Sequence, residues 1–163
     1  MAHAPDTPDK ARVVDALRQT VDAALAALAK MTEDTREEAT GTESRAESQY
    51  DTRATEASYL AAGQGRRLLG LRALAGWLSQ LDPGAPHTAV GPGALVCLSR
   101  GARPDWVLMA PEGGHTVTVD GVAVRLVSVR SPTGEALELL EPGDEAEIDT
   151  PGGAALLRIE AVC

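Results

Sequence analysis

The segment KARVVDALRQTVDAALAALAKM, residues 10–31, carries the pattern that decides the first half of the fold. Its apolar residues recur at alternating steps of three and four, which places them on one stripe of a helix. The stripe consists of Val14, Leu17, Val21, Ala24, Leu28 and Met31. Because Pro8 followed by Asp9 is typical of a helix start, we expect a helix from about Lys10, after a flexible N-terminus over residues 1–9.

A second stripe with the same spacing lies within residues 57–81 and ends at Asp82-Pro83-Gly84, which breaks a helix. Its positions are Ala57, Leu60, Gln64, Arg67, Leu71, Leu74, Leu78 and Leu81. Two stripes on either side of a polar stretch predict an antiparallel coiled coil over residues 10–82, in which each helix covers the apolar seam of the other. With about 30 residues per arm, such a rod is about 45 Å long.

The polar stretch between the stripes, about residues 33–56, would form the far end of this rod, and we refer to it as the acidic tip. It contains eight acidic and three basic residues, so it carries −5 of the net charge of −9. The acids are Glu33, Asp34, Glu37, Glu38, Glu43, Glu47, Asp51 and Glu56. We expect the chain to turn near Gly41 or, as the alternative, at Gln49–Thr52. The tip presents carboxylates to a shared cation or a basic channel, or it is only a solvated face or loop.

The composition restricts the partners that the chain can take. With a net charge of −9, we expect no direct binding to duplex DNA, because a polyanion is bound through Lys and Arg. An acidic protein favours a basic cleft, a metal ion or a basic protein surface. Cys97 and Cys163 form no CxxC pair, and no apolar run approaches the length of a membrane span or a signal peptide. We therefore expect a soluble, cytoplasmic protein with no membrane partner.

The second half is rich in Gly, Pro and Val, and it predicts a linker over residues 83–93 and a small β-rich domain over residues 94–163. The expected strands are Ala94–Ser99, Trp106–Ala110, Thr116–Val119, Val122–Val129, Glu145–Asp149 and Ala155–Val162. Asp120-Gly121 predicts a tight hairpin turn, and the stretch Pro132–Leu140 has room for one short helix. We expect a strongly bent antiparallel sheet carrying this helix, and hence an α+β chain.

Four short motifs in this half occur in a fixed order with compatible spacing. They are Ser131-Pro132-Thr133-Gly134, Ala136-Leu137, Gly143-Asp144-Glu145 and Thr150-Pro151-Gly152-Gly153. In this order they resemble the C-terminal, FKBP-like domain of the Gre transcript-cleavage factors. An antiparallel coiled coil before such a domain is also the Gre arrangement, so the resemblance covers the chain from about Lys10 to Val162.

The resemblance implies that the coiled coil enters the secondary channel of bacterial RNA polymerase and brings the acidic tip beside the catalytic Mg²⁺. The C-terminal domain would dock at the channel mouth, with Ser131, Pro132 and Gly134 in the docking turn. The chain would act as a monomer and would meet the nascent RNA 3′ end only indirectly. It would not be an enzyme itself, because most metal ligands belong to the polymerase; it would bind no metal alone and share Mg²⁺ with its partner.

The tip motif of the family reads Asp-Leu-x-Glu-Asn-Ala-Glu-Tyr, followed by x-Ala-Ala. The segment Ala57-Ser58-Tyr59-Leu60-Ala61-Ala62 matches its end, with Ser58 in place of the last Glu, and Asp51 lies one residue farther from the tyrosine than the metal-binding Asp. The resemblance assigns Asp51, Glu56 and Glu47 as tip carboxylates, and Tyr59, Ser58 and Arg53 as tip contacts. The central acid pair is not reproduced, so the factor either stimulates cleavage or is a cleavage-inactive homologue that inhibits or competes at the channel.

Other interpretations stay open. One is a coiled-coil interaction module, unrelated to the polymerase, that self-associates through Leu68–Leu81; another is a Gre-like regulator of a different enzyme. His3, His87 and His115 are too far apart in sequence to predict a zinc site. The acids between residues 135 and 149 are expected to form a solvated face, with docking to a basic patch as the alternative.

Overall fold

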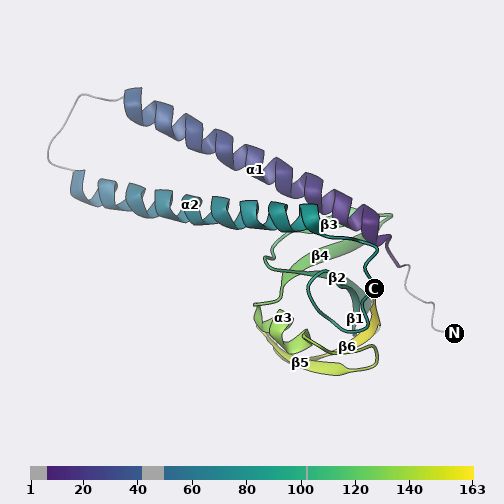
Figure 1. Ribbon diagram of the computed structural model, residues 1–163. Helices are drawn as coiled ribbons and strands as arrows, with labels where there is room; N and C mark the ends of the chain where they lie inside the picture. Colours follow the sequence, from purple (N-terminus) through teal and green to yellow (C-terminus); the bar gives the residue numbers. More distant parts are fainter. Residues whose placement is uncertain (1–6, 42–49, 102) are drawn as a thin grey trace. The chain divides into compact units, whose positions relative to one another are not determined.

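The computed structural model describes residues 7–41, 50–101 and 103–163, with the backbone alone for 35–41, 50–55 and 57. The elements are α1 (Lys10–Gly41), α2 (Tyr50–Gln80), β1 (Leu95–Arg100), β2 (Arg103–Ala110), β3 (Thr116–Val119), β4 (Val122–Ser128), α3 (Pro132–Leu137), β5 (Glu145–Thr150) and β6 (Gly153–Val162) (Figure 1). The prediction of an α+β chain with a helical N-terminal part and a β-rich C-terminal part is confirmed. The chain divides into two compact units, a helical unit (Val21–Gly76) and a β-rich unit (Met1–Thr20 with Trp77–Cys163).

The β-rich unit contains one six-stranded sheet in the order β3-β4-β2-β1-β6-β5. Every neighbouring pair is antiparallel except β2 and β4, which are parallel, so the prediction of a purely antiparallel sheet is wrong. The parallel pairing arises because the β3–β4 hairpin meets β2 along its β4 edge. The turn of this hairpin is Asp120-Gly121, where both residues have positive φ (52° and 79°). This turn forms the predicted β3–β4 hairpin, and β4 then lies beside β2 in the same direction.

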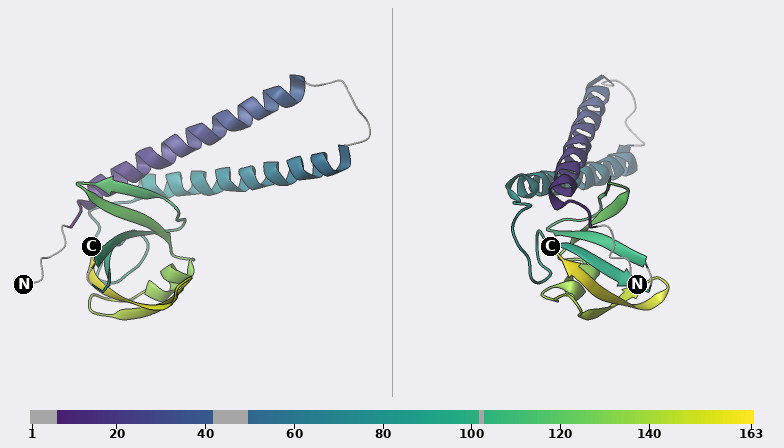
Figure 2. Two further views of the ribbon diagram at one scale, coloured as in Figure 1. Left: turned by 180° about the vertical axis from the view of Figure 1, so that it is seen from behind. Right: turned by 90° about the vertical axis from the view of Figure 1, so that its right-hand side faces the viewer.

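Both faces of the central strands are buried. Val96, Leu98, Val107 and Met109 belong to the core cluster that also contains Leu137 of α3. The residues that alternate with them, Leu95, Cys97, Trp106 and Leu108, are buried as well. Two further views show how strongly the sheet curls and how α3 lies beside β5 (Figure 2). Residues 83–93, where a linker is expected, contribute Val90 to the same core.

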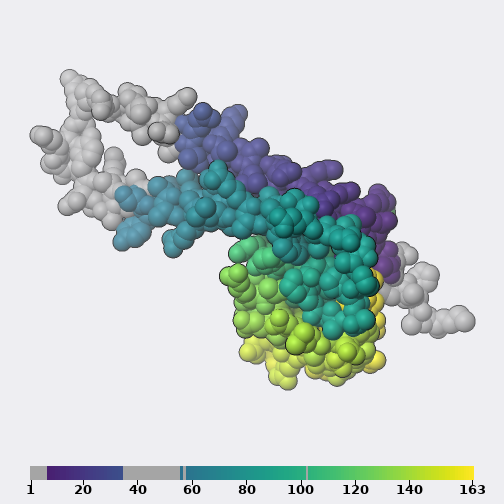
Figure 3. Space-filling model, in the orientation of Figure 1, coloured from purple at the N-terminus to yellow at the C-terminus, as the bar shows by residue number. Residues whose placement is uncertain are grey.

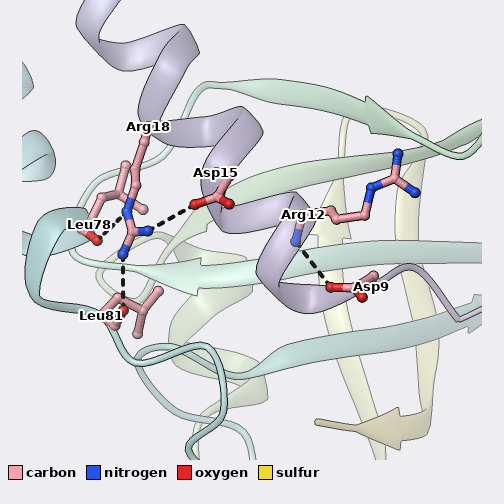
Figure 4. A network of polar contacts seen from close by, with 6 residues as sticks. All are labelled: Asp9, Arg12, Asp15, Arg18, Leu78 and Leu81. Carbon is pink, nitrogen blue, oxygen red and sulfur yellow. Dashed lines mark hydrogen bonds and ion pairs between the residues drawn. The ribbon is translucent and has the colours of Figure 1, made fainter.

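Three cationic side chains hold the start of α1 within the β-rich unit. Lys10 Nζ donates hydrogen bonds to the Cys163 carbonyl oxygen (3.0 Å) and the Ala85 carbonyl oxygen (3.4 Å), and Arg12 forms an ion pair with Asp120 in the β3–β4 turn. Figure 4 shows the third, Arg18. Its guanidinium donates to the Leu78 and Leu81 carbonyl oxygens at the end of α2 (3.0 and 3.2 Å) and to Asp15 (2.9 Å).

The start of α1 agrees with the sequence. Asp9 Oδ1 accepts a hydrogen bond from the Arg12 backbone N–H (3.1 Å; Figure 4), which is the contact of a helix N-cap. Val13, Val14 and Leu17 follow as fully buried residues. The predicted helix start is therefore confirmed, and its apolar stripe begins in the β-rich unit.

Within the helical unit the apolar seam is incomplete. Val21 and Leu28 of α1 and Leu71 and Leu74 of α2 are buried. Met31 and Leu60, which the stripes also include, are 57% and 65% exposed. The two predicted helices are confirmed, with 32 and 31 residues, but the coiled-coil hairpin is not.

The interruption has a physical reason in the sequence of α2. Gln64 and Arg67 occupy the seam positions between Leu60 and Leu71; Gln64 is half-buried and Arg67 is exposed. An amide and a guanidinium lose hydration when they are buried without partners, so these positions favour contact with water over a tight seam.

Candidate functional site

The candidate site is the acidic tip together with the α2 residues that follow it. Glu33 and Asp34 on α1 and Glu56, Ser58 and Tyr59 on α2 are all exposed, and Tyr59 is 73% exposed. Their side chains are available to another molecule.

Three predicted site residues fall on parts that are described less fully. Glu47 lies outside the described residues. Asp51 and Arg53 lie in the first turn of α2, where only the backbone is described. Tyr50 begins this helix, so Asp51 is at the end where the helix dipole favours a negative charge.

The continuous helix α2 sets how the tip carboxylates are spaced. Asp51 and Glu56 are five positions apart in it, which places them about 140° apart around the helix axis. Positions three or four apart are neighbours on a helix surface, whereas positions five apart are not. The two residues therefore do not form a pair on one face of α2.

The described part of this site contains few carboxylates that could share a cation: Glu33, Asp34 and Glu56. Mg²⁺ takes about six oxygen ligands in near-octahedral geometry. No group of three or more His, Cys, Asp or Glu that could hold a metal occurs among the described residues.

Sequence patterns alone do not identify the exposed apolar residues of the helical unit. The stripes predict that Met31 and Leu60 are covered by the opposite helix, and both are exposed. Leu69, which lies outside the stripe, is also 65% exposed. The one signal in the sequence was the pair of polar seam residues, Gln64 and Arg67.

The predicted docking turn is built by the packing of α3. Ser131 is the N-cap of this helix: its Oγ accepts a hydrogen bond from the Gly134 N–H (3.0 Å), and Pro132 occupies the first turn. A Cβ on Gly134 would lie 2.1 Å from the Ser128 carbonyl oxygen. Ser131 is thus a helix cap, and Ser131, Pro132 and Gly134 each have a reason in the fold.

The other turn motifs also have local structural causes. Gly143 adopts a φ of +99°, which favours glycine, and the Asp144 carboxylate accepts a hydrogen bond from the Glu141 N–H (2.8 Å). In the Thr150–Gly153 turn, Thr150 Oγ1 donates to the Gly153 carbonyl oxygen (2.7 Å). These motifs therefore indicate a fold, and none of them forms a catalytic or binding site by itself.

Comparisons with known proteins give only distant likenesses. No protein-family model matches the chain, and no curated protein matches its sequence. Several solved structures show a weak likeness, and three of them illustrate it. GreA factor homolog 1 (Gfh1) of Thermus thermophilus is 19% identical over 92% of this chain and 94% of that one, with a TM-score of 0.37. Thermus aquaticus Gfh1 is 19% identical over 94% of each chain, with a TM-score of 0.38. The transcription elongation factor GreA/GreB of Nitrosomonas europaea is 27% identical over 57% of this chain and 78% of that one, with a TM-score of 0.36.

TM-scores this low do not assign a function to the chain. No helix within residues 7–41, 50–101 and 103–163 is long and apolar enough to cross a membrane. The acids between residues 135 and 149 are exposed, in agreement with the predicted solvated face; they are Glu135, Glu138, Glu141, Asp144, Glu145, Glu147 and Asp149.

Two titratable side chains of the β-rich unit, Cys97 and His87, have shifted pKa values and lie outside the candidate site. Burial raises the pKa of the Cys97 thiol to about 11, so this cysteine is not a nucleophile near neutral pH. Burial also lowers the pKa of His87, and the nearby charge of Lys10 lowers it further. The Nε2 atom of His87 is buried and has no hydrogen-bond partner among the described residues.

Proposed function

We propose that this chain is a Gre-like regulator of bacterial RNA polymerase that binds in the secondary channel and modulates elongation. The observation that carries the proposal is the order of the four turn motifs after a long two-helix segment. A single Ser-Pro or Pro-Gly-Gly turn is common in proteins, but four such turns in one order, behind an acidic helical segment, are typical of this family.

The distribution of charge supports the same partner. The net charge of −9 disfavours direct contact with nucleic acid, and more than half of it lies in the acidic tip. The exposed carboxylates of Glu33, Asp34 and Glu56 suit a basic, water-filled channel. The docking turn at Ser131, Pro132 and Gly134 would then belong to the domain that stays at the channel mouth.

In this proposal the chain is a regulatory factor and not an enzyme. A tip carboxylate would share the Mg²⁺ of the polymerase, whose other ligands come from the polymerase itself. The contribution of this chain would be to place negative charge and Tyr59 near that centre and to occupy the channel.

A second candidate is a cleavage-inactive competitor at the same channel. It is favoured by the spacing of Asp51 and Glu56, which lie on different sides of α2, and by Ser58 in place of the family's Glu. Such a chain would occupy the channel without supplying a paired carboxylate site.

Binding is tested first, by pull-down of the chain with core RNA polymerase and competition with an authentic Gre factor. We expect binding at micromolar concentration, loss of binding on competition, and weaker binding of Glu56→Lys. Asp22→Lys is the matched control, because Asp22 is an exposed acid on α1 outside the acidic tip. No capture of the unchanged chain would refute the proposal.

Cleavage separates the two candidates. Stalled elongation complexes with Mg²⁺ should release short 3′ RNA fragments when a cleavage-stimulating factor is added, and should not do so with a cleavage-inactive one. If fragments appear and the double variant Asp51→Ala, Glu56→Ala still produces them, these two residues are not the tip carboxylates. A chain that releases no fragments but blocks release by an authentic Gre factor is the competitor.

A further inference from the structure

The part of α2 that precedes Leu71 has a sequence that disfavours a helix. Gly63 and Gly65 lie in the interior of α2, and a Cβ added to either would meet no neighbouring atom within 4 Å. Packing therefore does not require glycine at these two positions. After proline, glycine is the residue that most disfavours a helix interior, so the two glycines weaken α2 without a gain in packing. In α1, by contrast, residues 10–40 contain no glycine.

The buried seam of the helical unit stops near the same point. Leu71 and Leu74 of α2 are buried, whereas Leu60 is 65% exposed. On α1, Leu28 is buried and Met31, three residues farther on, is 57% exposed. The part of α2 before Leu71 lies at the surface of the helical unit (Figure 3, blue to teal). Because most of the stability of a helix in a protein comes from packing of its apolar face, this part of α2 lacks its main support.

Charged side chains do not replace the missing packing. Residues 57–80 contain three arginines and no acid, so no ion pair between neighbouring turns can form within them. The arginines are all exposed, and no ion pair among the described residues involves α2. They are Arg66, Arg67 and Arg72. Helix propensity, burial and charge thus agree that α2 is held less firmly before Leu71 than after it.

We propose that residues 57–69 of α2, the distal segment, open and close as a separate unit while the seam at Leu71 and Leu74 stays intact. The weak point is Gly63-Gln64-Gly65. Glycine takes up changes in φ and ψ at the lowest steric cost, and the half-buried amide of Gln64 gains water when the segment opens. A second molecule that covers Leu60 would favour the closed state. The inference concerns the chain by itself and goes beyond the proposed function.

Hydrogen–deuterium exchange of the full chain, measured by mass spectrometry, tests the proposal. We expect the amides of the distal segment to be protected at least about tenfold less than those of residues 71–79. The double variant Gly63→Ala, Gly65→Ala should raise the protection of the distal segment about tenfold, because alanine favours the helix at both positions, and should leave residues 71–79 unchanged.

Gly76→Ala is the matched control for the double variant. It makes the same substitution in the same helix, again with no neighbouring atom within 4 Å of the new Cβ, but on the other side of Leu71. If the distal segment opens separately, this variant should not change the protection of residues 57–69. If α2 opens as one unit, it should raise their protection as the double variant does.

Trypsin gives an independent measurement, because cleavage requires a locally unfolded chain. Arg66 and Arg67 lie in the distal segment, whereas Arg72 lies between the buried residues Leu71 and Leu74. We expect the initial cleavage after Arg66 or Arg67 to be at least about tenfold faster than that after Arg72. The double variant should slow it about tenfold.

Three results would overturn the inference. They are equal protection of residues 57–69 and 71–79, an equal gain of distal protection in Gly76→Ala and the double variant, and equal initial cleavage after Arg67 and Arg72. None of these measurements involves RNA polymerase. Failure of this inference therefore leaves the proposed function standing, and a chain that does not bind the polymerase can still have a separately opening distal segment.

Discussion

The β-rich unit and the helical unit of this chain treat their apolar residues differently. In the β-rich unit both faces of β1 and β2 are buried, Gly134 of α3 leaves no room for a Cβ, and Gly143 adopts a positive φ that favours glycine. In the helical unit Met31, Tyr59, Leu60 and Leu69 are exposed. The first unit is specified mainly by packing, although Leu139 and Leu156 are exposed in it, whereas the second leaves four large apolar or aromatic side chains that another molecule can cover.

The largest expected effect tests how tightly the β-rich unit is specified. Gly134→Ala places a Cβ 2.1 Å from the Ser128 carbonyl oxygen, so α3 must move away from β4. We expect a loss of at least about 4 kcal/mol in the free energy of unfolding, measured by urea denaturation. The same substitution at Gly70 in α2, where a Cβ would have no neighbour within 4 Å, should stabilise by about 0.5–1 kcal/mol. Equal effects at both positions would remove the contrast between the units.

The second prediction compares two leucines at seam positions of α2. Leu74 is 1% exposed and Leu60 is 65% exposed. Leu74→Ala should cost about 3 kcal/mol in the free energy of unfolding, because it leaves a cavity, whereas Leu60→Ala should change it by less than about 0.5 kcal/mol. A similar loss for both would mean that the seam is closed along its whole length, as in the coiled coil that the sequence predicts.

The third prediction concerns Arg18, which links α1 to the end of α2 inside the β-rich unit. Arg18→Ala removes the donors to the Leu78 and Leu81 carbonyl oxygens. We expect a loss of about 1–2 kcal/mol in the free energy of unfolding, because charged donors at a helix C-terminus satisfy carbonyl oxygens and oppose the helix dipole. Arg66→Ala is the control, since Arg66 is exposed in the middle of α2. An equal loss at both sites would show that Arg18 has no special role in this junction.

Local signals in the sequence predict most of the β-rich unit. Alternation gives Thr116–Val119 as a strand with the observed bounds, and Asp120-Gly121 gives the hairpin. The parallel pairing of β2 with β4 could not be predicted, because it depends on which strand edge the hairpin meets and not on either strand alone. The left-handed conformation of Leu139 could not be predicted either, because position 139 holds a leucine and not the glycine that usually marks such a conformation.

The candidate site was predictable only in part. Polarity places Glu56 in the acidic tip, and the resemblance assigns Ser58 and Tyr59 as tip contacts; all three are exposed. The helical phase between Asp51 and Glu56 follows only once α2 is known to be continuous from Tyr50. The exposure of Leu60 could not be read from its heptad position, because that position reports what a partner helix could cover, not whether it does.

The smallest expected effect is a pH dependence that arises in the β-rich unit. Burial and the charge of Lys10 lower the pKa of His87 in the folded chain below its ordinary value. The unfolded chain therefore takes up a proton on His87 more readily than the folded chain, so stability is fully present above about pH 6.5 and falls as the pH drops below it. Urea denaturation at pH 7.5 and pH 5.5 measures this fall, and His87→Gln should make it smaller because glutamine does not titrate. Nε2 of His87 has no partner among the described residues, so its protonation adds a positive charge near Lys10 that no described acceptor compensates. The variant Arg18→Ala leaves His87 in place, so it should show the same fall in stability as the unchanged chain. An unchanged pH dependence in His87→Gln would show that His87 is not its source, and would contradict the prediction.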